Sequence, residues 1–371
     1  MRLHPVDGAD ARAVRDALPA AVDGRRPIAL GFTPDAGDEV PDSTAVVIAT
    51  SGSSGVPKRV VLSGDALTAS ARATARRVGD GQWMLPLSAG YVAGVQVLVR
   101  SLLAGHEPVM LDGHFGPQAF VDATAALDAG IRFTSLVPAQ LSTLLDASTE
   151  LPAVRTALAA YDAILIGGQS LPAPLRERAL EAGASIVRTY GSSETAGGCV
   201  YDGIPLDGVR VVEIDGEVRI AGPTLATGYL GDPDLTERVF VPDDVGVVWY
   251  RTGDAGTVSD AGVVSVHGRI DNVIVSGGVN VSLDRVERVV RGIPGLAQAV
   301  VIGTTDERWG EASVVFATEL QNPDAVLETV RERVAAELGK PARPSHIHVL
   351  SQLPTLASGK PDREALRRLL R

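Results

Sequence analysis

Apolar runs alternate with amphipathic stretches along residues 45–190, and this alternation constrains the fold more than any other feature of the chain. Short apolar runs predict buried strands at residues 45–49, 108–111, 133–137, 163–166 and 185–187. Between them, helical periodicity marks residues 65–77, 95–103 and 173–182, and Ser63 is placed to cap the first of these helices. The pattern predicts an α/β fold with a large N-terminal domain, built on a doubly wound, mainly parallel sheet with helices on both faces.

The residue pattern changes after residue 200. Residues 209–220 alternate around Asp215 and Gly216, a tight hairpin signal, and short strands near 246–250 and 263–267 complete a β-rich subdomain. From about residue 272 the pattern restarts as a small α+β unit, with helices predicted at 284–291 and 325–338 and strands at 298–302 and 312–317. We therefore predict an N-terminal domain over residues 1–270 and a C-terminal domain over 271–371.

Composition narrows the classes of partner. The chain has 371 residues and a net charge of −11, which argues against nucleic acid or an anionic membrane as the main partner. No run approaches the roughly 20 apolar residues of a membrane span, and the first residues lack the apolar core of a secretory signal. The single cysteine, Cys199, suits the reducing cytoplasm. We expect a cytoplasmic protein without membrane insertion, whose anionic ligands meet a small local positive site.

Residues 46–58 form an apolar strand that leads into a loop of hydroxyls and glycines closed by a lysine. Glycine permits backbone shapes that aim successive N–H groups at one point, and such concavities hold anions. The loop residues with this chemistry are Thr50, Ser51, Gly52, Ser53, Ser54, Gly55 and Lys58. Their spacing fails the template of P-loop ATPases, and taken alone the segment is equally typical of an ordinary surface loop.

Five further segments concentrate polar chemistry at strand ends or turns. The residues in them that have candidate roles are Gly167, Gly168, Gln169, Tyr190, Gly191, Ser192, Ser193, Glu194, Asp254, Arg269, Asp271, Gly277, Gly278 and Lys360. Taken singly, several have plain structural interpretations: Asp254 is typical of a turn, Lys360 of a solvated surface and Gln169 of a polar strand end. The histidines show no metal-ligand spacing.

Taken in order, the six segments resemble the signature motifs of the adenylate-forming superfamily, which comprises acyl-CoA synthetases, peptide-synthetase adenylation domains and luciferases. The resemblance runs from about residue 45 to the C-terminus. It implies a large N-terminal domain and a small mobile C-terminal domain that swings over the active site. It also implies ATP, Mg²⁺ and, for a ligase, CoA as a substrate, with a small carboxylic acid as the molecule activated.

The resemblance also assigns roles to residues. The loop at 50–58 would hold the β- and γ-phosphates of ATP, and Glu194 would bind Mg²⁺. Tyr190 would stack on adenine, with Gly191, Ser192 and the segment 167–169 beside it. Asp254 would bind the ribose hydroxyls, and Arg269 the ribose or phosphate side. Lys360 would bridge the attacking carboxylate and the α-phosphate, which makes it a catalytic candidate with Glu194 and Ser193. Asp271 would be the hinge, and Gly277 and Gly278 would let the pantetheine thiol pass.

Two departures from the superfamily pattern point to a subfamily. Only 49 residues precede the loop at 50–58, far fewer than in most relatives, and the segment 85–94 lacks the histidine that many relatives have there. With the segments 91–100 and 134–141, these features resemble the shortened o-succinylbenzoate–CoA ligases of menaquinone biosynthesis. The acyl pocket would then be formed by Tyr91, Val92, Val137, Gly168 and Ser192, with Tyr91 as its gate.

Other interpretations stay open. One is a ligase for another aryl or fatty acid, or an adenylation module that loads a carrier protein. Another is a nucleotide-binding relative without turnover, although Lys58, Glu194, Asp254 and Lys360 are all present. A homodimer contact is one way in which the short N-terminal region could be complemented.

Overall fold

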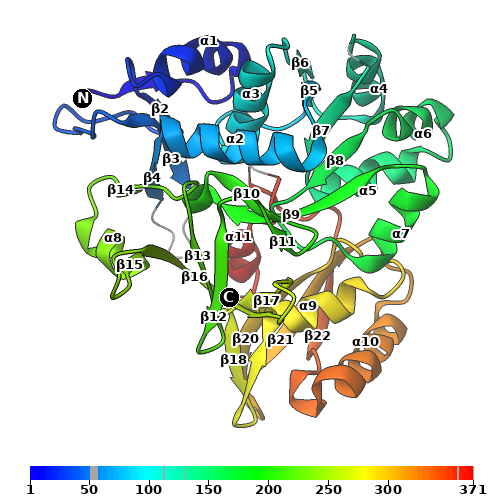
Figure 1. Ribbon diagram of the computed structural model, residues 1–371. Helices are drawn as coiled ribbons and strands as arrows, with labels where there is room; N and C mark the ends of the chain where they lie inside the picture. The colour runs from blue at the N-terminus through cyan, green and yellow to red at the C-terminus, as the bar shows by residue number, and fades with distance from the viewer. Residues whose placement is uncertain (51–56, 112, 129, 357–358, 371) are drawn as a thin grey trace.

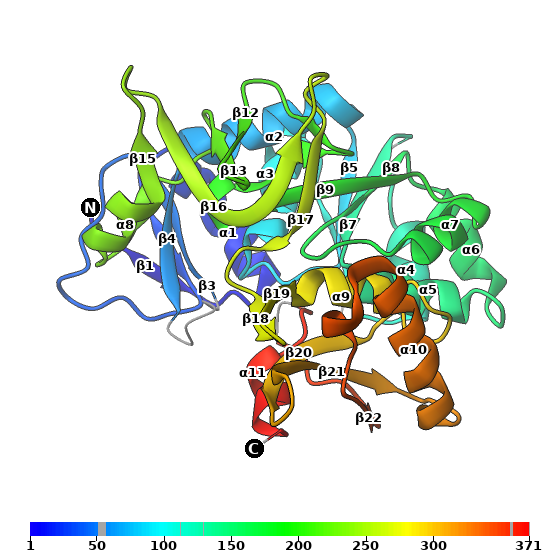
Figure 2. The same cartoon turned by 90° about the horizontal axis from the view of Figure 1, so that it is seen from below.

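The computed structural model describes residues 1–50, 57–111, 113–128, 130–356 and 359–370. Within these ranges the chain forms four sheets flanked by helices. Figures 1 and 2 show the first three sheets, blue to green, gathered into one body, with the yellow-to-red C-terminal part on one side of it. The predicted α/β fold class is confirmed.

The central sheet has the strand order β11-β10-β9-β8-β7-β5-β6. Its parallel strands are β5 (Gln82–Leu85), β6 (Val109–Met110), β7 (Arg132–Leu136), β8 (Ala163–Ile166) and β9 (Ile186–Ser192). Antiparallel strands β10 (Gly197–Tyr201) and β11 (Ile204–Pro205) extend one edge. The helices along this stretch are α3 (Val92–Ala104), α4 (Pro117–Ala125), α5 (Pro138–Ala147), α6 (Pro152–Ala159) and α7 (Ala173–Glu181). Four of the five predicted strands lie here.

The fifth predicted strand, at residues 45–49, belongs to a different sheet, and its assignment to the doubly wound sheet was wrong. It is β3 (Thr44–Thr50), parallel to β2 (Ile28–Leu30) and antiparallel to β4 (Lys58–Ser63). The sheet is completed by β1 (His4–Val6) and β14 (Gly228–Tyr229). The connection from Thr50 to Lys58 is too short for a parallel crossover, so the two strands pair as a hairpin, with Thr50 opposite Lys58.

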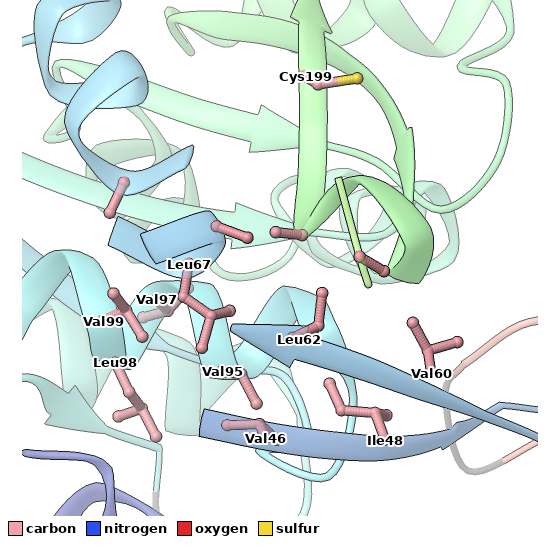
Figure 3. Close-up of a cluster of buried hydrophobic side chains, with 14 of the residues drawn as sticks. Val46, Ile48, Val60, Leu62, Leu67, Val95, Val97, Leu98, Val99 and Cys199 are labelled. Atoms are coloured by element: carbon pink, nitrogen blue, oxygen red, sulfur yellow. The ribbon is translucent and has the colours of Figure 1, made fainter. Parts of the chain in front are cut away.

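Figure 3 shows how this sheet packs against two helices. Alternate residues of the two strands, Val46 and Ile48 with Val60 and Leu62, are fully buried and meet Leu67 of α2 (Gly64–Val78) and the apolar face of α3. The hydroxyl of Ser63 accepts a hydrogen bond from the amide of Ala66 at 3.0 Å, so the predicted cap is present. Helix α1 (Ala11–Val22) lies against the same sheet.

Cys199 lies within the same core and is fully buried. Burial raises the pKa of its thiol to about 12, which keeps the thiol protonated and unreactive. Cys199 is therefore a structural residue of this core.

The third sheet is the β-rich subdomain. Its strands are β12 (Arg210–Ile214), β13 (Glu217–Ala221), β15 (Phe240–Pro242), β16 (Val248–Val258) and β17 (Val264–Arg269), with α8 (Pro233–Val239) beside them. Asp215 and Gly216 both have positive φ and form the predicted tight turn between β12 and β13.

The C-terminal part contains its own sheet and two apolar clusters of its own. Its strands are β18 (Val273–Ser276), β19 (Val279–Ser282), β20 (Val300–Asp306), β21 (Gly310–Thr318) and β22 (His346–Leu350), and its helices are α9 (Leu283–Arg291), α10 (Pro323–Leu338) and α11 (Arg363–Arg368). We call residues 271–371 the C-terminal unit. A separate core is what an independently moving domain needs.

Candidate active site

A cavity of about 710 Å³ lies where the central sheet, the β-rich subdomain and the C-terminal unit meet. This volume is typical of a site for a small-molecule ligand. The predicted site residues that line it are Thr50, Lys58, Tyr91, Val92, Val137, Gly167, Gly168, Gly191, Ser192, Ser193, Glu194, Arg269 and Lys360. Segments more than 300 residues apart in the sequence thus converge on one cavity.

Six predicted residues within the described part of the chain are absent from its lining: Gln169, Tyr190, Asp254, Asp271, Gly277 and Gly278. The two glycines form the turn between β18 and β19, both with positive φ, and the amide of Gly277 donates to the carbonyl of Trp309 at 2.8 Å. Ser51, Gly52, Ser53, Ser54 and Gly55 lie outside the described residues. Of that loop, the two ends are placed: the Thr50 hydroxyl donates to the Lys58 carbonyl at 3.3 Å.

Glu194 lies at the floor of the cavity in the short turn η1 (Ser193–Thr195), where it is almost fully buried. The hydroxyl of Tyr229 donates to Glu194 Oε1 at 2.8 Å. Burial, and then the charge of Glu194, raise the pKa of Tyr229, so the phenol stays a donor. Lys58 Nζ lies 5.5 Å from the centre of the Tyr229 ring. Tyr229 therefore connects the two charged groups of this end of the cavity.

Sequence reasoning missed Tyr229. Its role becomes visible only through sheet pairing, because β14 places Tyr229 opposite Val60, two residues from Lys58. A Gly-Tyr pair in the sequence does not by itself indicate that neighbour.

Lys360 reaches the cavity from the C-terminal unit. It lies so close to Gly168 that a methyl group added there would be 3.5 Å from Lys360 Cε. Gly168 has a φ of +81°, which a larger residue would adopt only with strain. Burial lowers the pKa of the Lys360 ammonium, and the charge of Glu194 acts in the opposite direction. The ammonium and the carboxylate thus share one electrostatic environment although they come from different parts of the chain.

Asp254 and Asp271 are joined by Arg269. Tyr190 donates to Asp254 Oδ2 at 2.6 Å, and Arg269 Nη1 lies 3.4 Å from Asp254 Oδ1. Arg269 also binds both oxygens of Asp271, at 3.0 and 3.1 Å, which holds the pKa of Asp271 below its usual range. Burial raises the pKa of Asp254, partly offset by Tyr190 and Arg269. The predicted hinge residue is therefore clamped to the side of the cavity.

The opposite end of the cavity is formed around α3 and contains one buried cation. Arg100 is 7% exposed, lines the cavity, and donates to the hydroxyl of Tyr201 at 3.3 Å. Its guanidinium lies 4.9 Å from the centre of the Trp83 ring, and its Nε has no hydrogen-bond partner in the described structure. Among the described residues no carboxylate pairs with it. Burial lowers the pKa of Arg100, yet a guanidinium remains charged.

Sequence reasoning missed Arg100 as well, although a signal was present. Arg100 is the only charged residue in the apolar helix α3, and it lies four and eight residues after Gln96 and Val92, which share its face and also line the cavity. Gln96 is buried too, and its Oε1 has no partner in the described structure. Two unsatisfied polar groups on one buried face can be satisfied by water or by a polar ligand there.

Comparison with known proteins agrees with this geometry. Residues 6–230 match the AMP-binding enzyme family and residues 285–360 match the AMP-binding enzyme C-terminal domain. A probable 2-succinylbenzoate–CoA ligase of Mycobacterium tuberculosis is 42% identical over 89% of this chain and 85% of its own length. A medium-chain fatty-acid–CoA ligase of Escherichia coli is 30% identical over 88% of this chain and 61% of its own.

Among solved structures, the o-succinylbenzoate coenzyme A synthetase of Bacillus subtilis in complex with AMP is similar with a TM-score of 0.73. It is 26% identical, over 87% of this chain and 69% of its own. The chain belongs to the AMP-binding enzyme family, whose members are adenylate-forming enzymes. The resemblance inferred from the six motifs is thereby confirmed.

Two further features bear on ligands and location. In the described ranges no helix combines the length and the apolar character that crossing a membrane requires. No three His, Cys, Asp or Glu side chains of the described residues gather into a metal site. Glu194 alone suits Mg²⁺, which is usually held by one or two carboxylates together with substrate phosphates.

Proposed function

We propose that this protein is an ATP-dependent acid–CoA ligase that activates o-succinylbenzoate, the acid also called 2-succinylbenzoate. The observation that carries the choice of acid is Arg100. This acid has two carboxylates, of which only one is activated, and Arg100 is a buried cation without a carboxylate partner among the described residues. A site that holds such a cation favours a ligand whose second carboxylate stays ionised. The 42% identical relative, named as a ligase for the same acid, supports the proposal.

In the first step, a carboxylate oxygen of the acid attacks the α-phosphorus of ATP and pyrophosphate leaves. We assign Lys360 to the oxygens that gain negative charge in this transition state, because it enters the cavity beside Glu194 and Gly168. Lys58 and the loop at 50–58 would bind the β- and γ-phosphates. Ser193 lies next to Glu194 on the same turn and is assigned to the phosphate region.

Glu194 would hold Mg²⁺, which supplies charge neutralisation on the phosphate oxygens when bound. Its partner Tyr229 fixes the carboxylate in one orientation, leaving Oε2 for another ligand. We assign the nucleoside to the side of the cavity formed by Gly191 and Ser192, with Tyr190 and Asp254 behind it. Asp254 would bind the ribose hydroxyls once a nucleotide competes for its oxygens.

In the second step, the thiol of CoA attacks the acyl carbonyl, AMP leaves and the thioester forms. We propose that residues 1–270 form a fixed domain and residues 271–371 a domain that turns about Asp271 between the two steps. Rotation would withdraw Lys360 and bring the turn of Gly277 and Gly278 to the cavity, where its lack of side chains would let the pantetheine pass. The separate cores of the C-terminal unit support such a motion.

The second candidate is a ligase for a fatty acid. It is favoured by the 30% identity with the Escherichia coli enzyme and by the apolar wall formed by Leu87, Val92 and Val137. A purely apolar acyl chain would leave Arg100 and Gln96 unsatisfied, and we therefore prefer the dicarboxylic acid. The cytoplasm is the proposed location, since a single buried cysteine suits a reducing compartment.

The test measures acid-dependent ATP–pyrophosphate exchange with a panel of aryl, dicarboxylic and fatty acids, followed by CoA and mass spectrometry of the thioester. We expect exchange with o-succinylbenzoate at low acid concentration and the corresponding CoA thioester. Faster exchange with a fatty acid would assign the second candidate instead. Acyl transfer to a carrier protein but not to CoA would indicate an adenylation module, and ATP binding without exchange for any acid would indicate a relative without turnover.

A further inference from the structure

The loop that follows β8 is contacted by the C-terminal unit at more than one point. Lys360 lies against Gly168, and a methyl group added at Gly359 would lie 3.4 Å from Cγ2 of Val137, which follows the neighbouring strand β7. The third contact is farther from the cavity: Arg291 Nη1 of α9 donates to Oε1 of Gln169 at 3.4 Å. Gln169 does not line the cavity.

Arg291 is held rigidly inside the C-terminal unit. It is 6% exposed, its Nε donates to the carbonyl of Ala299 at 2.7 Å, and its Nη2 lies 2.9 Å from Glu287 Oε1. Glu287 is itself fixed, because Arg363 and the amide of Val301 bind its Oε2 at 2.6 and 2.9 Å. Two of the three guanidinium nitrogens, Nε and Nη2, are therefore committed within the unit. The third nitrogen, Nη1, is the one that donates to Gln169.

Gln169 is presented from the other side by a fixed backbone. β8 ends at Ile166, and the amide of Gly167 donates to the Leu136 carbonyl of the neighbouring strand at 3.2 Å. The positive φ of Gly168 then turns the chain so that Gln169, half-buried, faces α9. Both partners of this bond are thus preorganised, which keeps the entropic cost of forming it low.

We propose that Gln169 is a positioning residue for acyl-AMP formation: its hydrogen bond to Arg291 docks the C-terminal unit in the orientation that places Lys360 in the cavity. The proposal rests on the proposed function, since it needs two half-reactions in two domain orientations. A bond to a neutral carboxamide stabilises the docked orientation and still breaks readily when the unit must turn. A carboxylate at this position would form a charge-assisted bond, roughly twice as strong, and would hold the unit docked.

This predicts opposite effects on the two half-reactions, because a bond made in only one orientation shifts the population between the two. Q169M removes the acceptor at similar length, and we expect acyl-AMP formation to slow about three- to tenfold, with thioester formation from supplied acyl-AMP unchanged or faster. Q169E should leave acyl-AMP formation near the wild-type rate and slow thioester formation by a similar factor. Each half-reaction is measured in single-turnover rapid-quench experiments.

Gln118 provides the matched control. It lies in α4, where its side chain pairs with Asp122 of the same helix, and Q118M and Q118E should change neither half-reaction. R291K is the second test. It keeps a positive charge beside Glu287 but lacks the planar guanidinium that reaches Gln169, so adding Q169M to R291K should not slow acyl-AMP formation further. Equal slowing of both half-reactions by Q169M and Q169E, or additive loss in R291K/Q169M, would overturn the docking role.

A readout without turnover separates this proposal from the proposed function. Val245 and Leu369 are exposed residues on the two parts of the chain, and Cys199 is buried, so V245C/L369C accepts a fluorophore pair at those positions. With ATP present, Q169E should shift the energy transfer toward the docked value and Q169M away from it. Unchanged transfer in both variants would contradict the docking bond, even if no acid proved to be a substrate. Conversely, a shift in energy transfer without adenylation of any acid would support the docking bond and refute the assigned reaction.

Discussion

The two ends of the cavity are built differently. At the phosphate end, Lys58, Glu194 and Lys360 come from three separate segments, and two cations share this end with one carboxylate. Tyr229 contacts Lys58 and donates to Glu194. At the acyl end, Arg100 is a single cation on a continuous helix, buried among apolar and aromatic neighbours. The phosphate end thus combines charges of both signs, whereas the acyl end contains a buried cation without a counter-ion among the described residues.

The difference has a functional consequence. Charges of both signs partly compensate one another without a ligand, and they serve any substrate that carries the same phosphates, so they fit a step common to many acids. An unbalanced buried cation costs desolvation energy until an anion binds, so it is retained where it selects one kind of ligand. We infer that the phosphate end determines the chemistry and the acyl end determines the acid.

The largest expected effect is at the phosphate end. K360A should slow acyl-AMP formation about 10²–10³-fold, the scale for removing one oriented donor from a transition state. Thioester formation from supplied acyl-AMP should be nearly unchanged, because Lys360 acts only in the first step. The measurement is pyrophosphate release in single turnover, compared with thioester formation from synthetic acyl-AMP.

K340A is the matched control for this prediction. Lys340 is an exposed lysine in the same C-terminal unit and does not line the cavity. Wild-type pyrophosphate release in K360A would break the comparison, because Lys360 would then not be the catalytic cation that we assign to the phosphate end.

The next effect is at the acyl end and should appear in acid binding. R100M replaces the guanidinium with an uncharged side chain, and we expect the KM for o-succinylbenzoate to rise about 10–100-fold, the scale for losing a hydrogen-bonded ion pair in a buried site. An analogue without the non-reacting carboxylate should bind R100M as well as or better than it binds the wild type. No described carboxylate is left unpaired by the change, so the fold should tolerate it.

Steady-state kinetics with the two acids check this prediction. An equal loss for both would mean that Arg100 supports the pocket wall and does not select the acid. The two ends would then differ in position but not in function.

The difference between the two ends of the cavity also explains which site residues could be predicted from the sequence. The predicted residues of the phosphate end lie in segments rich in glycine and hydroxyl side chains, where the order and spacing of residues along the chain indicate phosphate binding. Lys58, Glu194 and Lys360 do meet in one cavity. Arg100 lies within a helix whose apolar pattern predicts only that the helix is buried. The residues that surround Arg100 are known only once α3 is packed in the fold. Tyr229 and the Arg291–Gln169 contact depend on pairing between distant elements. The prediction that placed β3 in the doubly wound sheet was wrong for the same reason, because local periodicity does not indicate which sheet a strand joins.

The smallest effect tests whether the phosphate end depends on the orientation of the Glu194 carboxylate as well as on its charge. Y229F removes only the hydroxyl that donates to Glu194, leaving the ring beside Lys58. A carboxylate free to rotate binds a cation less well, so we expect the Mg²⁺ concentration for half-maximal adenylation to rise about three- to tenfold, with the maximal rate largely recovered at high Mg²⁺. Binding of Mn²⁺ followed by electron paramagnetic resonance should weaken by a similar factor, without reference to turnover.

Y161F is the control, because Tyr161 is equally buried, bonds to Thr124 and lies outside the cavity lining. If Y229F and Y161F lowered only thermal stability, by like amounts and with no change in Mg²⁺ dependence, the phenol would be a packing element and would not orient Glu194 for the cation.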